Sequence, residues 1–149
     1  MKRIGFRVIL LFVLVAVAFV FACEKKEGPK GRLIVSDESF FMRQDNENAY
    51  VIDAKGKIKN VGEYDVKQVK VTAKCLSCIQ EIIPGKWFVS SDIEKTDEQR
   101  DTISYIAVGD EEEFAFKEVA FIYNTVAAPP AHMPEEFEVV IESFETVTD

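Results

Sequence analysis

The sequence has few of the residues that build metal and redox centres: one histidine, His132, and three cysteines in 149 residues. One cysteine pair and one histidine fall short of the four ligands of a structural zinc site. Isoleucine follows Cys78, so the C-x-x-C-H sequence of covalent haem attachment is absent. No G-x-S-x-G, H-E-x-x-H or glycine-rich phosphate loop occurs either. We therefore expect no metal, no cofactor and no catalytic residue.

Long apolar runs are also lacking, except for one at the start. The basic segment "MKRIGFR" precedes fourteen apolar residues, Val8 to Phe21, and the small residue Ala22 follows. At 1.5 Å per residue this run forms a helix of about 21 Å, shorter than the hydrocarbon core of about 30 Å. A basic start, a short apolar core and a small residue are typical of an export signal. We expect residues 1–22 to be a signal peptide rather than a transmembrane anchor.

The end of this segment, "VFAC", resembles the bacterial lipobox: an aliphatic residue, a tolerant position, a small residue and a cysteine. The resemblance implies that Cys23 becomes the mature N-terminus and carries a diacylglycerol and a fatty acid. Phe21 departs from the pattern, where the residue is usually smaller, which predicts less efficient cleavage. Two or more acyl chains hold a protein stably on a bilayer. We expect an exported protein anchored to a bacterial membrane, either the outer membrane or the outer face of the cytoplasmic one; the alternative is secretion with a free Cys23.

The mature part is long enough for one domain with a core of its own. Residues 24–32, "EKKEGPKGR", are charged and contain glycine and proline, so we expect 23–32 to be a lipidated flexible tether before a domain at 33–149. Residues 92–149 carry sixteen acidic side chains against three basic ones. This acidic balance argues against a nucleic-acid partner.

Alternation with period two predicts a strand over residues 50–59, with apolar residues inward and Asp53 and three lysines outward. After "NVGEYD", which suits a turn, residues 68–75 alternate again, with Val69, Val71, Ala73 and Cys75 inward. We expect the two strands to pair as an antiparallel hairpin. Five lysines then share one outer face, a possible binding face: Lys55, Lys57, Lys59, Lys70 and Lys74.

Further segments predict strands in 32–43, 86–91, 102–108 and 136–147, and one or two strands in 113–123. The segment 92–101 is either a loop or a short helix. About seven short strands and no convincing helix indicate an all-β sandwich. We expect these aromatic residues in its core: Phe40, Phe41, Tyr50, Trp87, Tyr105, Phe114, Phe116 and Phe121.

Residues 54–75, "AKGKIKNVGEYDVKQVKVTAKC", resemble the "G-x-V-x-N-x-G … V-x-V-x-V" stretch of immunoglobulin-like modules in bacterial lipoproteins, especially the FxLYD type. "IAVGDEEEFAF" is similar to the "L-x-P-G-E-x-x-x-F" turn of that group, with Gly109, Asp110 and Phe114 in matching places and no proline before Gly109. "FEVVIESFE" is similar to its closing strand. The resemblance covers about residues 48–145. It implies an immunoglobulin-like β-sandwich on a membrane surface and no catalytic residue.

The sequence is compatible with several roles for Cys75 and Cys78. In an exported protein an even number of remaining cysteines favours a disulfide, which here requires a turn at Leu76–Ser77. A thioredoxin-type site places its first cysteine at a helix N-terminus, and no helix is predicted after Cys78. With His132 and Met133 the pair also suits Cu(I). We expect a non-enzymatic interaction module with an envelope protein, polysaccharide or lipid as partner; the alternative is a thiol-active redox or Cu(I)-handling protein.

Overall fold

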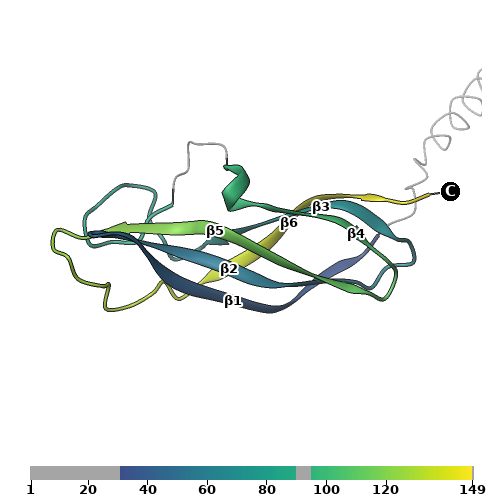
Figure 1. Ribbon diagram of the computed structural model, residues 1–149, viewed down its shortest axis with the longest axis horizontal. Coiled ribbons are helices and arrows are strands. Elements are labelled where there is room, and N and C mark those ends of the chain that lie inside the picture. The colour runs from purple at the N-terminus through teal and green to yellow at the C-terminus, as the bar shows by residue number, and fades with distance from the viewer. Residues whose placement is uncertain (1–30, 90–94, 149) are drawn as a thin grey trace, which may run out of the picture.

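The computed structural model describes residues 31–89 and 95–148, which form an elongated two-layer β-structure (Figure 1). Its strands are β1 (Leu33–Asn46), β2 (Ala49–Asn60), β3 (Val66–Cys75), β4 (Asp101–Ile106), β5 (Glu111–Tyr123) and β6 (Phe137–Thr146). The one helical element within the described ranges is a single 3-10 turn, η1 (Asp97–Gln99). The expectation of an all-β domain is confirmed.

The predicted signal peptide, 1–22, and Cys23 lie outside the described residues, and so does the tether apart from Gly31 and Arg32. Within the described part of the chain, no helix is long and apolar enough to cross a membrane.

The strands form two antiparallel three-stranded sheets that pack face to face, in the orders β1-β2-β5 and β4-β3-β6. The predicted hairpin of the second and third strands is therefore wrong, because β2 and β3 belong to different sheets and residues 61–65 cross between them. Both strands carry one apolar face, and each face is buried against the other sheet. A period of two predicts such a face, but it does not distinguish lateral pairing from stacking.

The predicted inner faces of these strands are confirmed. Val69, Val71 and Ala73 of β3 are buried in the core together with Phe114 of β5. Tyr50 and Phe116 are buried as expected, and Phe40, Trp87 and Phe121 are partly buried. Two expected core aromatics are instead exposed: Phe41 by 42% and Tyr105 by 47%. Phe41 follows the inward Phe40 and so faces outward, where Lys55 Nζ lies 5.9 Å from its ring centroid.

The described residues contain six strands rather than about seven. The predicted strand at 86–91 is reduced to isolated bridges that Phe88 makes with Ile79 and Phe121, and residues 90 and 91 are outside the described ranges. The segment from Glu111 to Tyr123 forms one long strand with a bulge.

The bulge in β5 explains a wrong prediction for Asp53, which is buried instead of facing solvent. Ile52 pairs with Ala120 and Ala54 pairs with Phe116, so β5 has three residues opposite Asp53. The Asp53 carboxylate accepts hydrogen bonds from Glu118 N (3.1 Å) and Arg43 Nε (2.7 Å). The bulge thus provides one of the donors that a buried carboxylate requires, and Arg43 of β1 provides the other.

The molecule has two different ends (Figure 1). The tether end comprises residues 31–33, 60–66, 106–111 and 144–148. There Gly31 lies against Phe144 and Val66, and β6 ends. The tip comprises residues 47–48, 76–89 and 124–136, which join strands at the opposite end. The twelve residues of β2 run between the two ends, a distance of about 40 Å.

Candidate functional site

The five lysines expected on one face are divided between the two sheets. Lys55, Lys57 and Lys59 lie on the outer face of the sheet that contains β2, whereas Lys70 and Lys74 lie on the outer face of the other sheet. The single lysine face is therefore wrong in its arrangement, because it depended on the hairpin that does not form.

Acidic residues also oppose the lysines of β2. Lys57 pairs in register with Glu113, and Lys59 pairs with Glu111. The ammonium of Lys57 lies 2.8 Å from a carboxylate oxygen of Glu111, which raises the pKa of Lys57 and lowers the pKa of Glu111. Cross-strand pairs of opposite charge stabilise a sheet, and on this face acidic side chains stand among the lysines, so it is not a field of one sign. Binding of an anion here stays a prediction.

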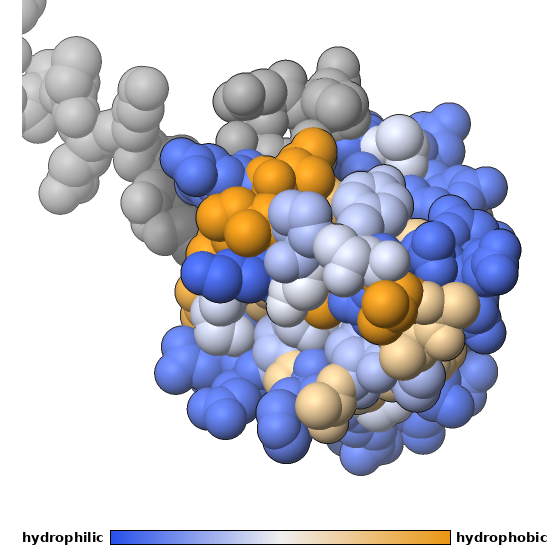
Figure 2. Space-filling view, turned by 90° about the vertical axis from the view of Figure 1, so that its left-hand side faces the viewer, coloured by the Kyte–Doolittle hydropathy of each residue, from blue (hydrophilic) through white to orange (hydrophobic). Residues whose placement is uncertain are grey.

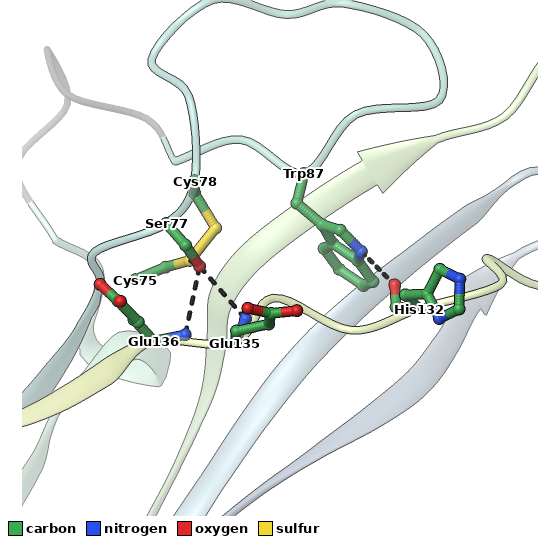
Figure 3. The surroundings of a disulfide bond; sticks show 7 residues. All are labelled: Cys75, Ser77, Cys78, Trp87, His132, Glu135 and Glu136. Carbon is green, nitrogen blue, oxygen red and sulfur yellow. Dashed lines mark hydrogen bonds between the residues drawn. A yellow bond between two sulfur atoms is a disulfide. The ribbon is translucent and has the colours of Figure 1, made fainter.

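Cys75 and Cys78 lie at the corner where β3 leaves its sheet (Figure 3). Their sulfurs are 2.00 Å apart, at disulfide distance, and the chain bends at Leu76 and Ser77 to bring the Cα atoms to 5.5 Å. Cys75 is buried and packs on the core, and Cys78 is partly buried beside it. The described residues directly after the pair, up to residue 89, contain no helix, so no helix dipole acts on the cysteines from that segment.

The corner joins the two long loops of the tip. The backbone N–H groups of Glu135 and Glu136 both donate to Ser77 Oγ at 3.2 Å, and Leu76 N donates to the Glu136 carbonyl at 2.9 Å. Farther out, the Trp87 indole N–H donates to the His132 carbonyl at 2.8 Å, as Figure 3 shows. Residue pairs about fifty positions apart in the sequence are thereby held together.

The tip exposes large apolar side chains. Leu76, Ile82 and Val126 are exposed by 57%, 68% and 64%, and Ile83 and Tyr123 are also exposed. Figure 2 looks along the long axis onto this end and shows apolar residues in several groups among hydrophilic ones. Apolar residues grouped on an exposed surface are typical of a binding site.

A hollow of about 570 Å³ lies between the two loops of the tip. Trp87, Met133 and the prolines of residues 129–134 contribute to its lining. Met133 packs against the core, which agrees with a structural role, and His132 uses its backbone carbonyl to hold Trp87. Within residues 31–89 and 95–148, no group of three histidine, cysteine or acidic residues is arranged to hold a metal ion.

At the tether end the structure gives Asn60 a role that sequence reasoning missed. Its side chain is fully buried; Nδ2 donates to the carbonyls of Tyr64 (2.9 Å) and Ile106 (3.1 Å), and Oδ1 accepts from Gly62 N (3.0 Å). The N-x-G sequence at 60–62 signals a turn, but nothing local in the sequence identifies Ile106 as a partner.

Asp65 makes a second polar connection at the tether end. It accepts hydrogen bonds from the Tyr105 hydroxyl and from Val108 N (2.8 Å), which lower its pKa, while the pKa of Tyr105 is raised by the same contact. These bonds link the β2–β3 crossing to the connection between β4 and β5, where Gly109 adopts a φ of +86°.

Comparison of the chain with protein-family models, with curated proteins and with solved structures gave no match.

Proposed function

We propose that this protein is a bacterial envelope lipoprotein, anchored through lipid on Cys23, whose immunoglobulin-like β-sandwich is a non-enzymatic interaction module. The observation that carries the proposal is the separation of the two ends. Gly31, near the end of the proposed tether, packs at one end, while the three most exposed of the large apolar side chains, Leu76, Ile82 and Val126, lie at the other. A lipid at Cys23 would hold the tether end near the bilayer and direct the tip away from it.

The strand order supports the immunoglobulin-like assignment. In that fold the strands named A, B and E share one sheet, and C and F lie in the other. The first, second and fifth strands of this chain share one sheet and the third and sixth share the other, with β4 beside β3 as an extra edge.

The charges at the tip favour a partner of complementary chemistry. The described tip residues include four exposed glutamates, Glu47, Glu81, Glu135 and Glu136, and one exposed basic residue, Lys86. An apolar group with an acidic rim fits a protein surface with an apolar centre and a basic rim, and it disfavours an anionic bilayer surface.

Membrane attachment is tested by the change Cys23→Ala. We expect the variant to leave the membrane fraction, because the acyl chains have no other attachment site. A variant that stays in the membrane pellet with an uncleaved signal would favour a transmembrane anchor instead.

The tip is tested by placing the photo-crosslinking residue p-benzoylphenylalanine at position 82 or, as a control, at position 70 on an outer sheet face. Irradiation of intact cells should give a discrete product from position 82 alone. The added change Val126→Glu, on the second loop of the tip, should reduce that product. Equal yields of crosslinked product from both positions would contradict a specific surface at the tip. A yield from position 82 that Val126→Glu does not change would also contradict it.

The thiol-active alternative is tested by a free-thiol assay on the exported protein. Under the leading proposal Cys75 and Cys78 stay oxidised in mild reductant, because the pair serves to hold the corner. A pair that exchanges readily with small thiols would support the alternative.

A further inference from the structure

A second cavity, the side cavity, opens on the side of the sandwich, where the pairing of β4 with β3 ends. β4 pairs with β3 only as far as Val71, so the last four residues of β3, 72–75, have no strand on that side among the described residues. A cavity of about 350 Å³ fills the space between this free edge and the bulged part of β5. Its size lies at the lower end of the range for small-molecule sites.

One wall of the side cavity carries a lysine with an unusual environment. Lys95 Nζ donates to Thr72 Oγ1 at 2.6 Å and to the Ala73 carbonyl, so it takes the place of a neighbouring strand at the free edge. These two bonds leave the third N–H of the ammonium without a partner among the described residues. Burial lowers the pKa of Lys95; the charge of Glu142 raises it, and the charges of Lys74 and Arg100 lower it again.

No carboxylate in the described ranges forms an ion pair with Lys95. Glu142, whose charge acts on Lys95, lies 3.2 Å from Arg100 Nε, although without the alignment of a hydrogen bond. Glu118 of β5 also lines the cavity, and burial and neighbouring acidic residues raise its pKa. A half-buried cation with no ion-pair partner among the described residues favours an anionic ligand.

The remaining wall is largely apolar. Cys75, Leu76, Val89, Val119 and Phe121 line the cavity, and Lys74, Gln80 and Gln99 add polar groups. An apolar wall with a few convergent polar groups is typical of sites that bind small organic molecules.

We propose that the side cavity binds a small amphipathic anion, with its charged group on the Lys95 ammonium and its apolar part against Val89, Val119 and Phe121. The side cavity borders the tip through Leu76, Gln80 and Val89, and binding there does not require the lipid anchor or the tip partner.

The proposal is tested with 4-benzoylbenzoate, an anionic photo-crosslinker with an apolar body, and with its uncharged amide as the matched probe. The full chain in non-ionic detergent is irradiated with each probe, and labelled residues are identified by mass spectrometry. We expect the anion to label the cavity residues about tenfold more than the amide does, as for one hydrogen bond to a charged group. Equal labelling by both probes would overturn the proposal.

Two variants separate binding from folding. Lys95→Gln should reduce anion labelling about tenfold by loss of the charged donor, whereas Lys70→Gln, on the same outer sheet face as Lys74, should not change it. Val89→Trp, which fills the cavity and keeps both hydrogen bonds of Lys95, should also abolish labelling while thermal unfolding stays that of a folded protein. Wild-type labelling in either cavity variant would refute the assignment.

Discussion

The tether end and the tip hold their connections together by different means. At the tether end, Asn60 and Asp65 bind backbone groups of two separate connections, and the Asn60 side chain is completely buried. At the tip, the loops meet through the Cys75–Cys78 corner and a few hydrogen bonds near the surface, and several apolar side chains remain in solvent.

This difference indicates that the tether end serves mainly the stability of the fold and that the tip is available for binding a partner. Buried polar groups that are fully hydrogen-bonded specify one arrangement, and they are costly to disturb. Exposed apolar residues on loops contribute little to folding and are available to a partner. We infer that the tether end fixes how the two sheets stack and that the tip can change its sequence with little loss of stability.

The largest contrast should come from truncating one aromatic residue in the core and one at the tip. Phe114→Ala should lower the free energy of unfolding by about 3–5 kcal/mol, because the ring is buried and its removal leaves a cavity. Its packing is tight: a Cβ added to Gly56 would lie 2.7 Å from Phe114 Cζ. Trp87→Ala at the tip should cost less, since Trp87 is only partly buried. Equal losses in denaturant unfolding would contradict the contrast.

The next effect concerns the buried asparagine. Asn60→Ala leaves two carbonyls and one N–H without their partner, and it should cost about 3 kcal/mol, the upper part of the range for a buried unsatisfied group. Asn124→Ala is the matched change at the tip, where the side chain bonds only the exposed carbonyl of Ala128, and it should stay within about 0.5 kcal/mol. The order of the two midpoints in urea decides the prediction.

The disulfide should have a smaller effect on stability. Replacing both Cys75 and Cys78 by alanine should cost about 2 kcal/mol or less, because the closed loop is very short and little chain entropy is removed from the unfolded state. Unfolding of the wild type in strong reductant should show the same loss. A loss as large as that of Phe114→Ala would mean that the corner, and not the core, organises the tip.

The smallest expected effect is a pH dependence at the tether end. Hydrogen bonds from Tyr105 and Val108 N lower the pKa of Asp65 in the folded state, so the unfolded chain binds a proton first as the pH falls. The stabilisation is complete above the unfolded pKa of about 3.9 and is lost as the pH falls through the lower folded pKa. Unfolding measured from pH 7 to pH 2 should show a steeper acid loss in wild type than in Asp65→Asn. Parallel curves would exclude this linkage.

Local sequence was sufficient for the class of fold and for most strand faces. Alternation in β2 and β3 placed Ile52, Val69 and Val71 in the core correctly, because burial of one strand face requires only a period of two. The Leu76–Ser77 turn and the approach of Cys75 to Cys78 were also predictable, since the two cysteines are three residues apart. The lipobox at Cys23 and the export signal remain predictions from sequence.

Only the tertiary structure decided which strands share a sheet. The wrong predictions of a hairpin and of a single lysine face follow from that. Stacking of β2 on β3 divided the five lysines, because the partner of an apolar face can be a neighbour or the opposite sheet. The burial of Asp53 depends on a bulge in β5, and the roles of Asn60 and Lys95 depend on carbonyls 46 and 22 positions away. Such contacts follow from chain topology, which the period of a single strand does not contain.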